Sequence, residues 1–311
     1  MRILLWHVHG SWTTAFVQGA HEYVVPVVPD RGPDGRGRAQ TWSWPGSVVE
    51  VPPERLAREP LDVVIVQSPR DEALAARWLG GRCPGRDLPL VWLEHNAPQG
   101  WINEMRHPAA DRGDLTIVHV THFNALFWDT GTTPTRVIEH GIVDPGEQYT
   151  GELARAAVVV NEPERRRRVT GTDLLALLGR DVPLDLFGIG AGALGGIENL
   201  PQARLHAEMA RRRVYLHPVR WTSLGLSLLE AMHLGMPVVA LATTEATSAV
   251  PPDAGVVSTR VDVLLAALRW LADDPEQARL MGKAARAAAL ARYGLARFLA
   301  DWDALLAEVT A

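Results

Sequence analysis

Short apolar runs alternate with stretches of helical spacing along most of the chain. Runs of this length are typical of buried strands rather than helices. We expect strands at 3–8, 24–28, 48–51, 61–66, 88–93, 115–120, 135–139, 156–160, 184–187, 214–217, 238–240 and 254–257. Apolar positions at helical spacing predict helices at 71–79, 172–178, 205–212, 261–273 and 275–311. Alternating strands and helices predict an α/β protein with Rossmann-like parallel sheets.

A polar, glycine-containing stretch at 145–153 interrupts this pattern. Strands and helices resume after it, so we expect a linker between two domains, residues 1–150 and 151–311. A hydrophobic share of 47% over 311 residues is enough to give each domain its own core.

Composition narrows the class of protein further. No apolar run approaches the roughly 20 residues that span a bilayer, and the apolar start before Gly10 is too short for a signal peptide. Cys83 is the only cysteine, which excludes an internal disulfide framework and a cysteine zinc cluster. We therefore expect a cytoplasmic protein. The net charge of −5 argues against nucleic acid as a partner.

The stretch 214–244 is the most informative part of the chain. It has the pattern of a buried strand, a turn, a helix, a Gly-X-Pro stop and a second buried strand. The hydroxyl of Thr222 or Ser223 is expected to cap the helix. Gly235 is expected to end it before Pro237 leads into the next strand. The stretch therefore predicts one strand–helix–strand turn of a parallel sheet.

Glu230 lies two turns into this helix, among Leu, Ala and Met residues. For a single Glu on a helix, exposure to solvent is the simplest explanation. The stretch as a whole, however, resembles the signature of retaining glycosyltransferases of family 4, E-G-F-G-L-x-x-x-E-A-M-A-x-G-x-P-V-V-A. The positions that match it in register are Gly225, Leu226, Glu230, Ala231, Met232, Gly235, Pro237, Val238, Val239 and Ala240.

This resemblance implies a GT-B fold, in which two Rossmann-like doubly wound domains face one another across a cleft. It also implies that the last helix, at about 293–311, crosses back to the N-terminal domain. The N-terminal domain would bind the acceptor and the C-terminal domain the nucleotide-sugar, whose ribose hydroxyls Glu230 would hold. Relatives transfer the sugar with retention and without a metal, and the nucleotide-sugar is a substrate, so no cofactor is expected. One departure is clear, because Thr222 stands where the family has its first Glu.

The diphosphate of such a donor has to be held by cations or by backbone N–H groups. The start of the helix before Glu230 offers N–H groups and a favourable dipole, and the loop after the first strand does so in relatives. A short Gly-X-Gly turn at 188–190 is a further candidate, although such turns are frequent. The residues assigned to donor binding are Glu230, Thr222, Ser223, Gly225, Leu226, Gly10 and Gly188.

Cations for the diphosphate are less well defined by the sequence. The family supplies an Arg and a Lys after the first strand of the second domain, and this chain lacks both at the matching positions, near Asn161 and Gly171. Arg166 or Arg168, in the arginine run 165–168, would take their place. A solvated arginine run on a loop explains these residues equally well.

Histidines stand at the ends of three strands expected in the first domain: His7 with His9, His95, and His119 with His122. Ligands bind at the carboxyl ends of parallel strands, although a single loop histidine is commonly solvated. The run around His95 is similar to the family's strand that ends in His-Asp or His-Asn. This implies that His95 lies near the acceptor hydroxyl, and His122 is the second catalytic candidate. No histidine pair has the spacing of a helical zinc site, so no metal is expected.

We therefore expect a glycosyltransferase that moves a sugar from a nucleotide-sugar to an unidentified acceptor, which would be a small molecule, a glycan or a lipid-linked molecule. A nucleotide-sugar epimerase of the same fold is an alternative. A catalytically silent nucleotide-sugar-binding protein is another, and Thr222 with the missing Arg and Lys favours it. The arginine runs 165–168 and 211–213 would allow peripheral contact with an anionic membrane, but exposed charge on helices explains them more simply.

Overall fold

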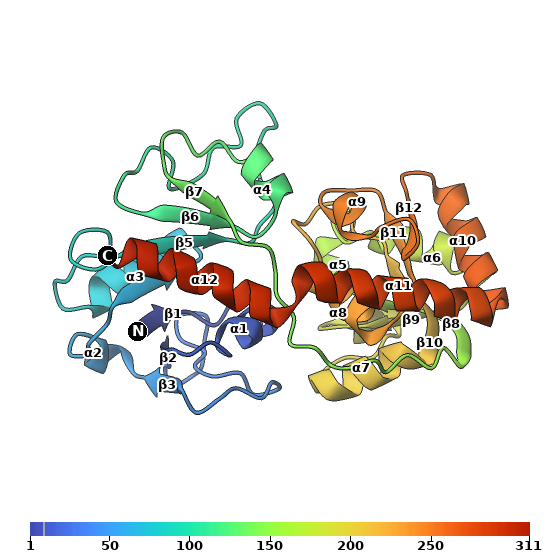
Figure 1. Cartoon of the computed structure of the whole chain (residues 1–311), viewed down its shortest axis with the longest axis horizontal. Coiled ribbons are helices and arrows are strands. Elements are labelled where there is room, and N and C mark those ends of the chain that lie inside the picture. Colours follow the sequence, from blue (N-terminus) through green and yellow to red (C-terminus); the bar gives the residue numbers. More distant parts are fainter. Residues whose placement is uncertain (9) are drawn as a thin grey trace. The chain divides into compact units, whose positions relative to one another are not determined.

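The computed structural model describes residues 1–8 and 10–311. The chain divides into two compact units (Figure 1). The first unit comprises Met1–Gly141 and Leu295–Ala311, and the second comprises Ile142–Gly294. The first unit is thus built from two separate parts of the chain.

The division between the units lies before the boundary that the sequence pattern places after residue 150. Backbone hydrogen bonds explain the difference. The N–H of Tyr149 donates to the carbonyl of Leu234 over 3.1 Å, and the N–H of Gly151 donates to the carbonyl of Ala210 over 3.1 Å. These bonds tie the polar stretch before residue 153 to the second unit.

Seven parallel strands form the sheet of the first unit, in the order β3-β2-β1-β4-β5-β6-β7. Their bounds are Arg2–Leu5 (β1), Glu22–Pro26 (β2), Val48–Val51 (β3), Val63–Val66 (β4), Leu90–Glu94 (β5), Thr116–His119 (β6) and Thr135–Val137 (β7). Each strand expected in this half is present. The chain runs from β1 to β2 and β3 on one side and resumes at β4 on the other, so the strand order reverses between β1 and β4.

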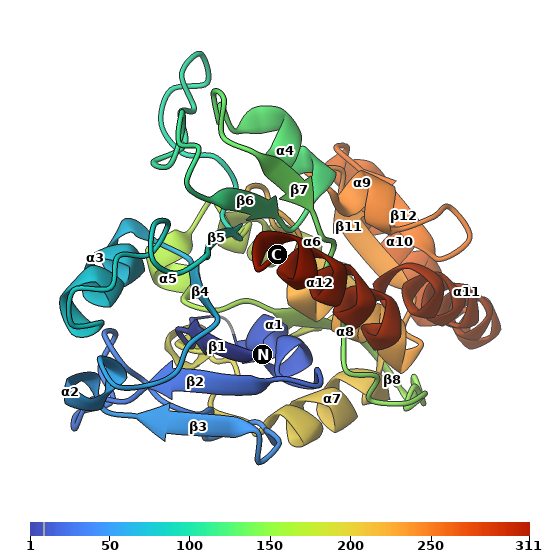
Figure 2. The ribbon, with the colours of Figure 1, turned by 60° about the vertical axis from the view of Figure 1, so that its left-hand side comes forward.

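Helices of the first unit pack on this sheet. They are α1 (Gly10–Phe16), α2 (Pro53–Leu56), α3 (Pro69–Trp78), α4 (His122–Phe127) and α12 (Leu295–Val309). Residues of α2 and α3 join the hydrophobic core that the strands form. The last helix, α12, lies beside α1 (Figure 2). The Trp302 ring lies 5.6 Å from Trp12 and 4.9 Å from Phe16 between centroids, so aromatic packing holds α12 to the first unit.

Five parallel strands form the sheet of the second unit, in the order β12-β11-β10-β8-β9. They are Leu153–Val159 (β8), Leu184–Phe187 (β9), Arg212–His217 (β10), Val238–Leu241 (β11) and Gly255–Ser258 (β12). Short helical segments follow β8, β9 and β11: α5 (Pro163–Arg166), a 3₁₀ turn (Thr172–Leu174), α6 (Leu175–Leu178), a second 3₁₀ turn (Ala191–Leu194) and α9 (Ala246–Ala249). The longer helices are α7 (Gln202–Arg211), α8 (Leu226–Leu234), α10 (Val261–Asp273) and α11 (Pro275–Tyr293).

Two hydrophobic cores flank this second sheet. One joins the strands to α7, α8 and α11, and the other joins them to α6 and α10. Neighbouring strand residues such as Val214 and Tyr215 belong to different cores, as the alternation of side chains along a strand requires. The second unit is therefore a doubly wound sheet, and the expected α/β class with two parallel sheets is confirmed.

The stretch 214–244 forms the expected strand, helix and strand, β10, α8 and β11. The predicted cap is wrong, because the residue that caps α8 is Gly225 and no side chain caps it. The loop before it is held by other bonds, among them one from the N–H of Glu245 to the carbonyl of Ser223 over 3.4 Å. The end of the helix agrees with the prediction, since Gly235 has a φ of 87°.

Two expected helices differ from the prediction. The segment 172–178 is a 3₁₀ turn followed by the single turn of α6, and the segment 275–311 is broken at Gly294 into α11 and α12. The first residue of α11 is Pro275, which fits a helix start because proline lacks an N–H to satisfy there. In the part of the chain that the structure describes, no helix is both long and apolar enough to cross a membrane.

Candidate active site

The carboxyl edge of the second sheet, where its strands end, brings two candidate segments together. The order of strands reverses between β8 and β10, which is where open α/β sheets hold ligands. The segment after β8 and the loop after β10 are bonded to one another. The N–H groups of Arg220 and Trp221 donate to the carbonyl of Val169 over 2.8 and 3.2 Å. Gly171 approaches the carbonyl of Pro218 so closely that no side chain would fit there.

In the arginine run after β8, one guanidinium, that of Arg166, makes no hydrogen bond within the described residues. The other members of the run are engaged: Arg165 pairs with Glu162, Arg167 donates to the carbonyl of Glu164, and Arg168 pairs with Asp173. Within residues 1–8 and 10–311, no hydrogen bond or ion pair reaches the guanidinium of Arg166, which is half-buried. Burial, followed by repulsion from Arg165, lowers the pKa of Arg166, and a weaker attraction to Glu162 opposes the change. An anion bound beside Arg166 would relieve both effects.

Three residues at the same edge have a strained backbone. Glu162 and Arg167, on either side of α5, have φ values of 54° and 38°, and Thr244 after β11 has a φ of 49°. Non-glycine residues rarely adopt such angles, and they tend to occur at binding and catalytic sites. The strain therefore agrees with a functional role for the segment that carries Arg166.

The start of α8 lies in the loop after β10. Gly225 is the cap residue, with an extended backbone (φ −71°, ψ 119°), and Leu226 is the first helical residue. The first N–H groups of an α-helix have no acceptor within the helix, so they can bind an anion. Thr222 and Ser223 come just before this helix start in the sequence, and Thr222 is partly exposed whereas Ser223 is buried.

Glu230 is buried in α8 and does not face solvent, with 5% of its surface exposed. Its carboxylate lies against α7. Gln202 Nε2 donates to Glu230 Oε1 over 3.4 Å, and His206 Nε2 lies 3.4 Å from Oε2. Gln202 and His206 are four residues apart and so lie on one face of α7. The solvent-exposed alternative is therefore wrong, and α7 orients this carboxylate.

The turn at 188–190 has no spare N–H groups. Gly188 has a φ of 132°, and a side chain there would meet the carbonyl of Val160. Its N–H donates to the carbonyl of Ile197, and the N–H groups of Ile189 and Gly190 donate to side chains of Asn161 and Glu198. In this structure Gly188 keeps the ends of β8 and β9 close together.

His95 and His122, the predicted catalytic residues, have different surroundings in the first unit. His95 follows β5 and is buried, with the Trp12 ring edge-on at 5.2 Å and the His140 ring stacked at 6.3 Å between centroids. His122 is the exposed first residue of α4, which Thr121 caps through its hydroxyl. His95 is thus fixed in place by rings, whereas His122 is open to solvent.

The loop after β1 holds the other candidates of the first unit. Gly10 begins α1, and the Trp42 ring lies against it, with Nε1 2.9 Å from where a β-carbon would be. His7 bonds through Nδ1 to the carbonyl of Gly37 over 3.2 Å, and burial lowers its pKa. His9 lies outside the described residues.

A buried pair beside His95 was not predicted from the sequence. Glu94 ends β5, and its Oε2 lies 3.0 Å from His107 Nε2. His107 Nδ1 accepts from the N–H of Ala109 over 3.0 Å, so the proton of the neutral ring is on Nε2 and donates to Glu94. His107 lies in an irregular loop with no motif around it, so only the fold reveals this pair.

His119, at the end of β6, is fully buried, and neither of its ring nitrogens has a hydrogen-bond partner in the described part of the chain. Burial, with a smaller effect from His107, lowers the pKa of His119 to about 4. In the unfolded chain the ring takes up a proton below about pH 6.5. The unfolded state therefore binds more protons than the folded state as the pH falls, and the first unit loses stability.

This burial predicts acid sensitivity of the first unit. Between pH 6.5 and 4, His119 is expected to remove about 3 kcal/mol from the free energy of unfolding. Urea unfolding at a series of pH values would measure it. His119→Leu should reduce this dependence on pH, whereas the control His122→Leu, at an exposed position, should not. An unchanged pH dependence in His119→Leu would contradict the prediction.

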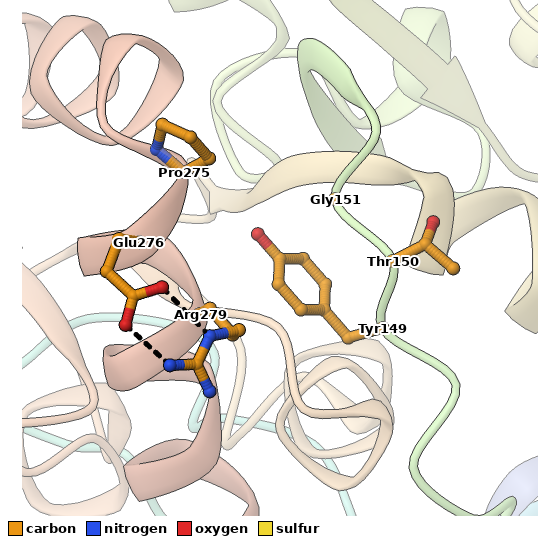
Figure 3. Close-up of a pocket in the computed structure, with 6 residues that line it drawn as sticks. All are labelled: Tyr149, Thr150, Gly151, Pro275, Glu276 and Arg279. Atoms are coloured by element: carbon orange, nitrogen blue, oxygen red, sulfur yellow. Dashed lines mark hydrogen bonds and ion pairs between the residues drawn. The ribbon is translucent and has the colours of Figure 1, made fainter.

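A hollow of about 280 Å³ lies elsewhere on the second unit (Figure 3). Its lining residues are Tyr149, Thr150, Gly151, Pro275, Glu276 and Arg279. Tyr149 donates through its hydroxyl to the carbonyl of Arg213, near the start of β10, so the hollow is at the amino ends of the strands. Ligands of open α/β sheets bind at the opposite edge. None of the predicted site residues lines this hollow.

Among residues 1–8 and 10–311, no cluster of three or more His, Cys, Asp or Glu side chains is placed to hold a metal ion.

Part of the second unit matches the model of a known family. Residues 196–288 match the model of glycosyl transferases group 1, and this segment includes Gly225 and Glu230. The chain thus carries a glycosyltransferase domain, and the protein is a transferase. No curated protein matches the chain significantly.

Solved structures share the fold over nearly the whole chain. Sucrose-phosphate synthase from Thermosynechococcus elongatus is 14% identical over 99% of this chain and 98% of that chain, with a TM-score of 0.71. Anabaena HepE in complex with UDP-glucose is 14% identical over 99% of this chain and 100% of that chain, with a TM-score of 0.67. A glycosyltransferase from Rickettsia africae is 12% identical over 99% of this chain and 97% of that chain, with a TM-score of 0.64. At such identities the likeness shows the fold alone, two parallel-sheet domains of the GT-B type.

Proposed function

We propose that this protein is a retaining glycosyltransferase similar to family 4, which moves a sugar from a nucleotide-sugar to an acceptor without a metal ion. The observation that carries the proposal is the half-buried guanidinium of Arg166. It makes no hydrogen bond or ion pair within the described residues, and its segment is hydrogen-bonded to the loop that leads into α8. A cation and a helix start at one sheet edge suit a diphosphate.

The donor is proposed from both the site and the relatives. The HepE structures contain UDP or UDP-glucose, and a nucleotide-sugar is accordingly our proposal for this chain. Glu230 would accept hydrogen bonds from the ribose hydroxyls, with Gln202 and His206 holding its carboxylate in place. Gly225 and Leu226 would present N–H groups to the diphosphate.

Transfer with retention needs no nucleophile from the protein. The bond between the anomeric carbon and the phosphate oxygen breaks, a bond to the acceptor oxygen forms on the same face, and the acceptor proton passes to the leaving phosphate. Arg166 and the start of α8 would stabilise the charge that develops on this phosphate. His95 and His122, which belong to the first unit, are proposed to orient the acceptor hydroxyl.

Contact with a membrane receives little support from the arginine run 211–213. These arginines are occupied within the second unit: Arg211 pairs with Glu152 and Glu208, Arg212 pairs with Asp185 and Glu208, and Arg213 donates to the carbonyls of Gly151 and Ala272. Their charge is largely compensated, so the acceptor is proposed without reference to a membrane. A cytoplasmic location remains a prediction.

A thermal-shift panel of UDP-, GDP- and ADP-sugars tests the donor site. A ligand that binds only the folded protein at about 100 times its Kd adds about 2.7 kcal/mol to the free energy of unfolding. At least one nucleotide-sugar is expected to raise the Tm of the wild type. If none does, the donor site is assigned wrongly.

Arg166→Ala and Arg168→Ala form a matched pair for the same panel. Because a hydrogen bond to a charged group contributes about 1.5–3 kcal/mol, Arg166→Ala should weaken donor binding about 10- to 100-fold. Arg168 is exposed and paired with Asp173, so its replacement should leave the affinity unchanged. Equal effects of the two substitutions would show that Arg166 has no special role.

Nucleotide release distinguishes the remaining classes. The transferase would release nucleoside diphosphate only with a suitable acceptor, and an epimerase would convert the sugar without one. A silent binding protein would be stabilised by the donor and never release nucleotide.

A further inference from the structure

His217, the last residue of β10, is a buried polar side chain without a partner. Only 3% of its surface is exposed, and its Nδ1 is buried without a hydrogen bond. The unsatisfied nitrogen in the described part of the chain is thus Nδ1. An unsatisfied buried polar group costs about 1–3 kcal/mol, so a purely structural role would favour an apolar residue here. A ligand that reached the ring would complete its hydrogen bonding.

The imidazole of His217 lies directly over the start of α8. A β-carbon built on Gly225 would be 3.1 Å from His217 Nε2 and closer still to Cε1. Gly225 is therefore required for the imidazole to occupy this place. The ring also stacks on Tyr215 at 6.1 Å between centroids, and the Tyr215 hydroxyl is bonded to Ser227 Oγ over 2.9 Å. The ring is thus held in one orientation against the first turn of the helix.

Two groups suited to anions therefore converge at the start of α8. The first turn of α8 has N–H groups that the helix itself cannot satisfy. Burial lowers the pKa of His217 to about 4, so at neutral pH the ring is uncharged and carries one N–H. Such a donor costs less to bury than a cation. A hydrogen bond from it to an anionic oxygen would be charge-assisted and strong.

We propose that His217 is a phosphate-binding residue, whose ring N–H donates a hydrogen bond to a diphosphate oxygen held at the start of α8. The ligand class is a nucleoside diphosphate, free or as the leaving part of the nucleotide-sugar. This inference rests on the proposed function and deepens it. The glycosyltransferase assignment requires a nucleotide-sugar site but does not require His217 in it.

Titration calorimetry with the full chain tests the proposal. The probes are UDP, GDP and ADP, each beside its own nucleoside, uridine, guanosine or adenosine. His217→Phe keeps a ring of similar size and removes both ring nitrogens. It is expected to weaken binding of the diphosphate about 10- to 100-fold, and to leave binding of the nucleoside unchanged. His217→Asn, which keeps an N–H donor, should restore part of the affinity.

The outcomes separate this inference from the proposed function. If the wild type binds none of the six probes, the proposed function fails and this inference fails with it. If the wild type binds a diphosphate and His217→Phe binds it equally well, the inference is overturned and the proposed function stands. Equal weakening of diphosphate and nucleoside would also overturn it, because the ring would then act on the whole site.

A measurement on the wild type covers the case in which His217→Phe does not fold. The imidazole N–H resonance of His217 can be followed by NMR during titration with the diphosphate that binds. A new hydrogen bond to phosphate should move this resonance downfield, and the matching nucleoside should not move it. An unchanged resonance at saturation would overturn the proposal.

Discussion

Glu230→Gln is expected to weaken binding of the nucleotide-sugar about 100-fold without unfolding the protein, because the hydrogen bonds that a charged acceptor makes contribute about 1.5–3 kcal/mol each. The substitution removes the charge and keeps the shape of the side chain. The amide oxygen can still accept from Gln202 Nε2, so packing of α8 on α7 should persist. The bonds to the ribose hydroxyls would lose their charge-assisted strength.

Calorimetry with the best donor of the panel would measure this effect, and Glu276→Gln is its control. Glu276 is an exposed carboxylate on α11 that lines the hollow at the amino edge of the sheet, where no donor is expected. It is bonded to Arg279 within the same helix (Figure 3). Donor affinity should be unchanged by the control. Equal affinity of Glu230→Gln and the wild type would remove Glu230 from the donor site.

Gly282→Val is expected to cost about 3 kcal/mol of the free energy of unfolding of the second unit, which is the upper part of the range for overpacking. Gly282 is buried in the middle of α11, where a β-carbon would collide with the carbonyl of Gly235. The β-carbon at residue 282 and the carbonyl of Gly235 are both fixed to the backbone, so neither can rotate away. α11 and the end of α8 would therefore have to separate. Helix propensity alone would favour replacing a glycine inside a helix, and the close approach outweighs it.

Ala287→Val is the matched control for this loss, since it places the same side chain on the exposed side of the same helix. It should lower the free energy of unfolding by no more than the difference in helix propensity between Ala and Val, about 0.7 kcal/mol or less. Urea unfolding of the three proteins would give the free energies. If Gly282→Val and Ala287→Val lower the free energy of unfolding equally, the close approach of α11 to Gly235 does not determine the loss.

The sequence was most informative where local signals decide the structure. In the stretch 214–244 the apolar runs, the helical spacing and Gly235 predicted β10, α8 and β11, because each depends on residues next to it. The cap of α8 was predicted incorrectly for the opposite reason. Hydroxyl residues before a helix usually cap it, but here the loop holding Ser223 is bonded to other parts of the unit, and Gly225 begins the helix.

Side-chain partners of the site could not be predicted. The sequence treats Arg166 and Arg168 alike, and only the folded unit shows that Asp173 pairs with Arg168. The lack of a partner for His217 depends in the same way on what surrounds β10. Such pairings join residues that the chain brings together only on folding, and they carry no periodic signal. The resemblance to a family predicted a donor site in more detail than the residue pattern did.

The two-part construction of the first unit has a consequence for synthesis on the ribosome. Trp12 and Phe16 leave the ribosome early, but their covering residue Trp302 follows only after the whole second unit. At about 5–20 residues per second, the second unit has time to fold in the interval. Until then the nascent chain exposes an aromatic surface that α12 will later bury, so this protein should depend on chaperones more during translation than after release.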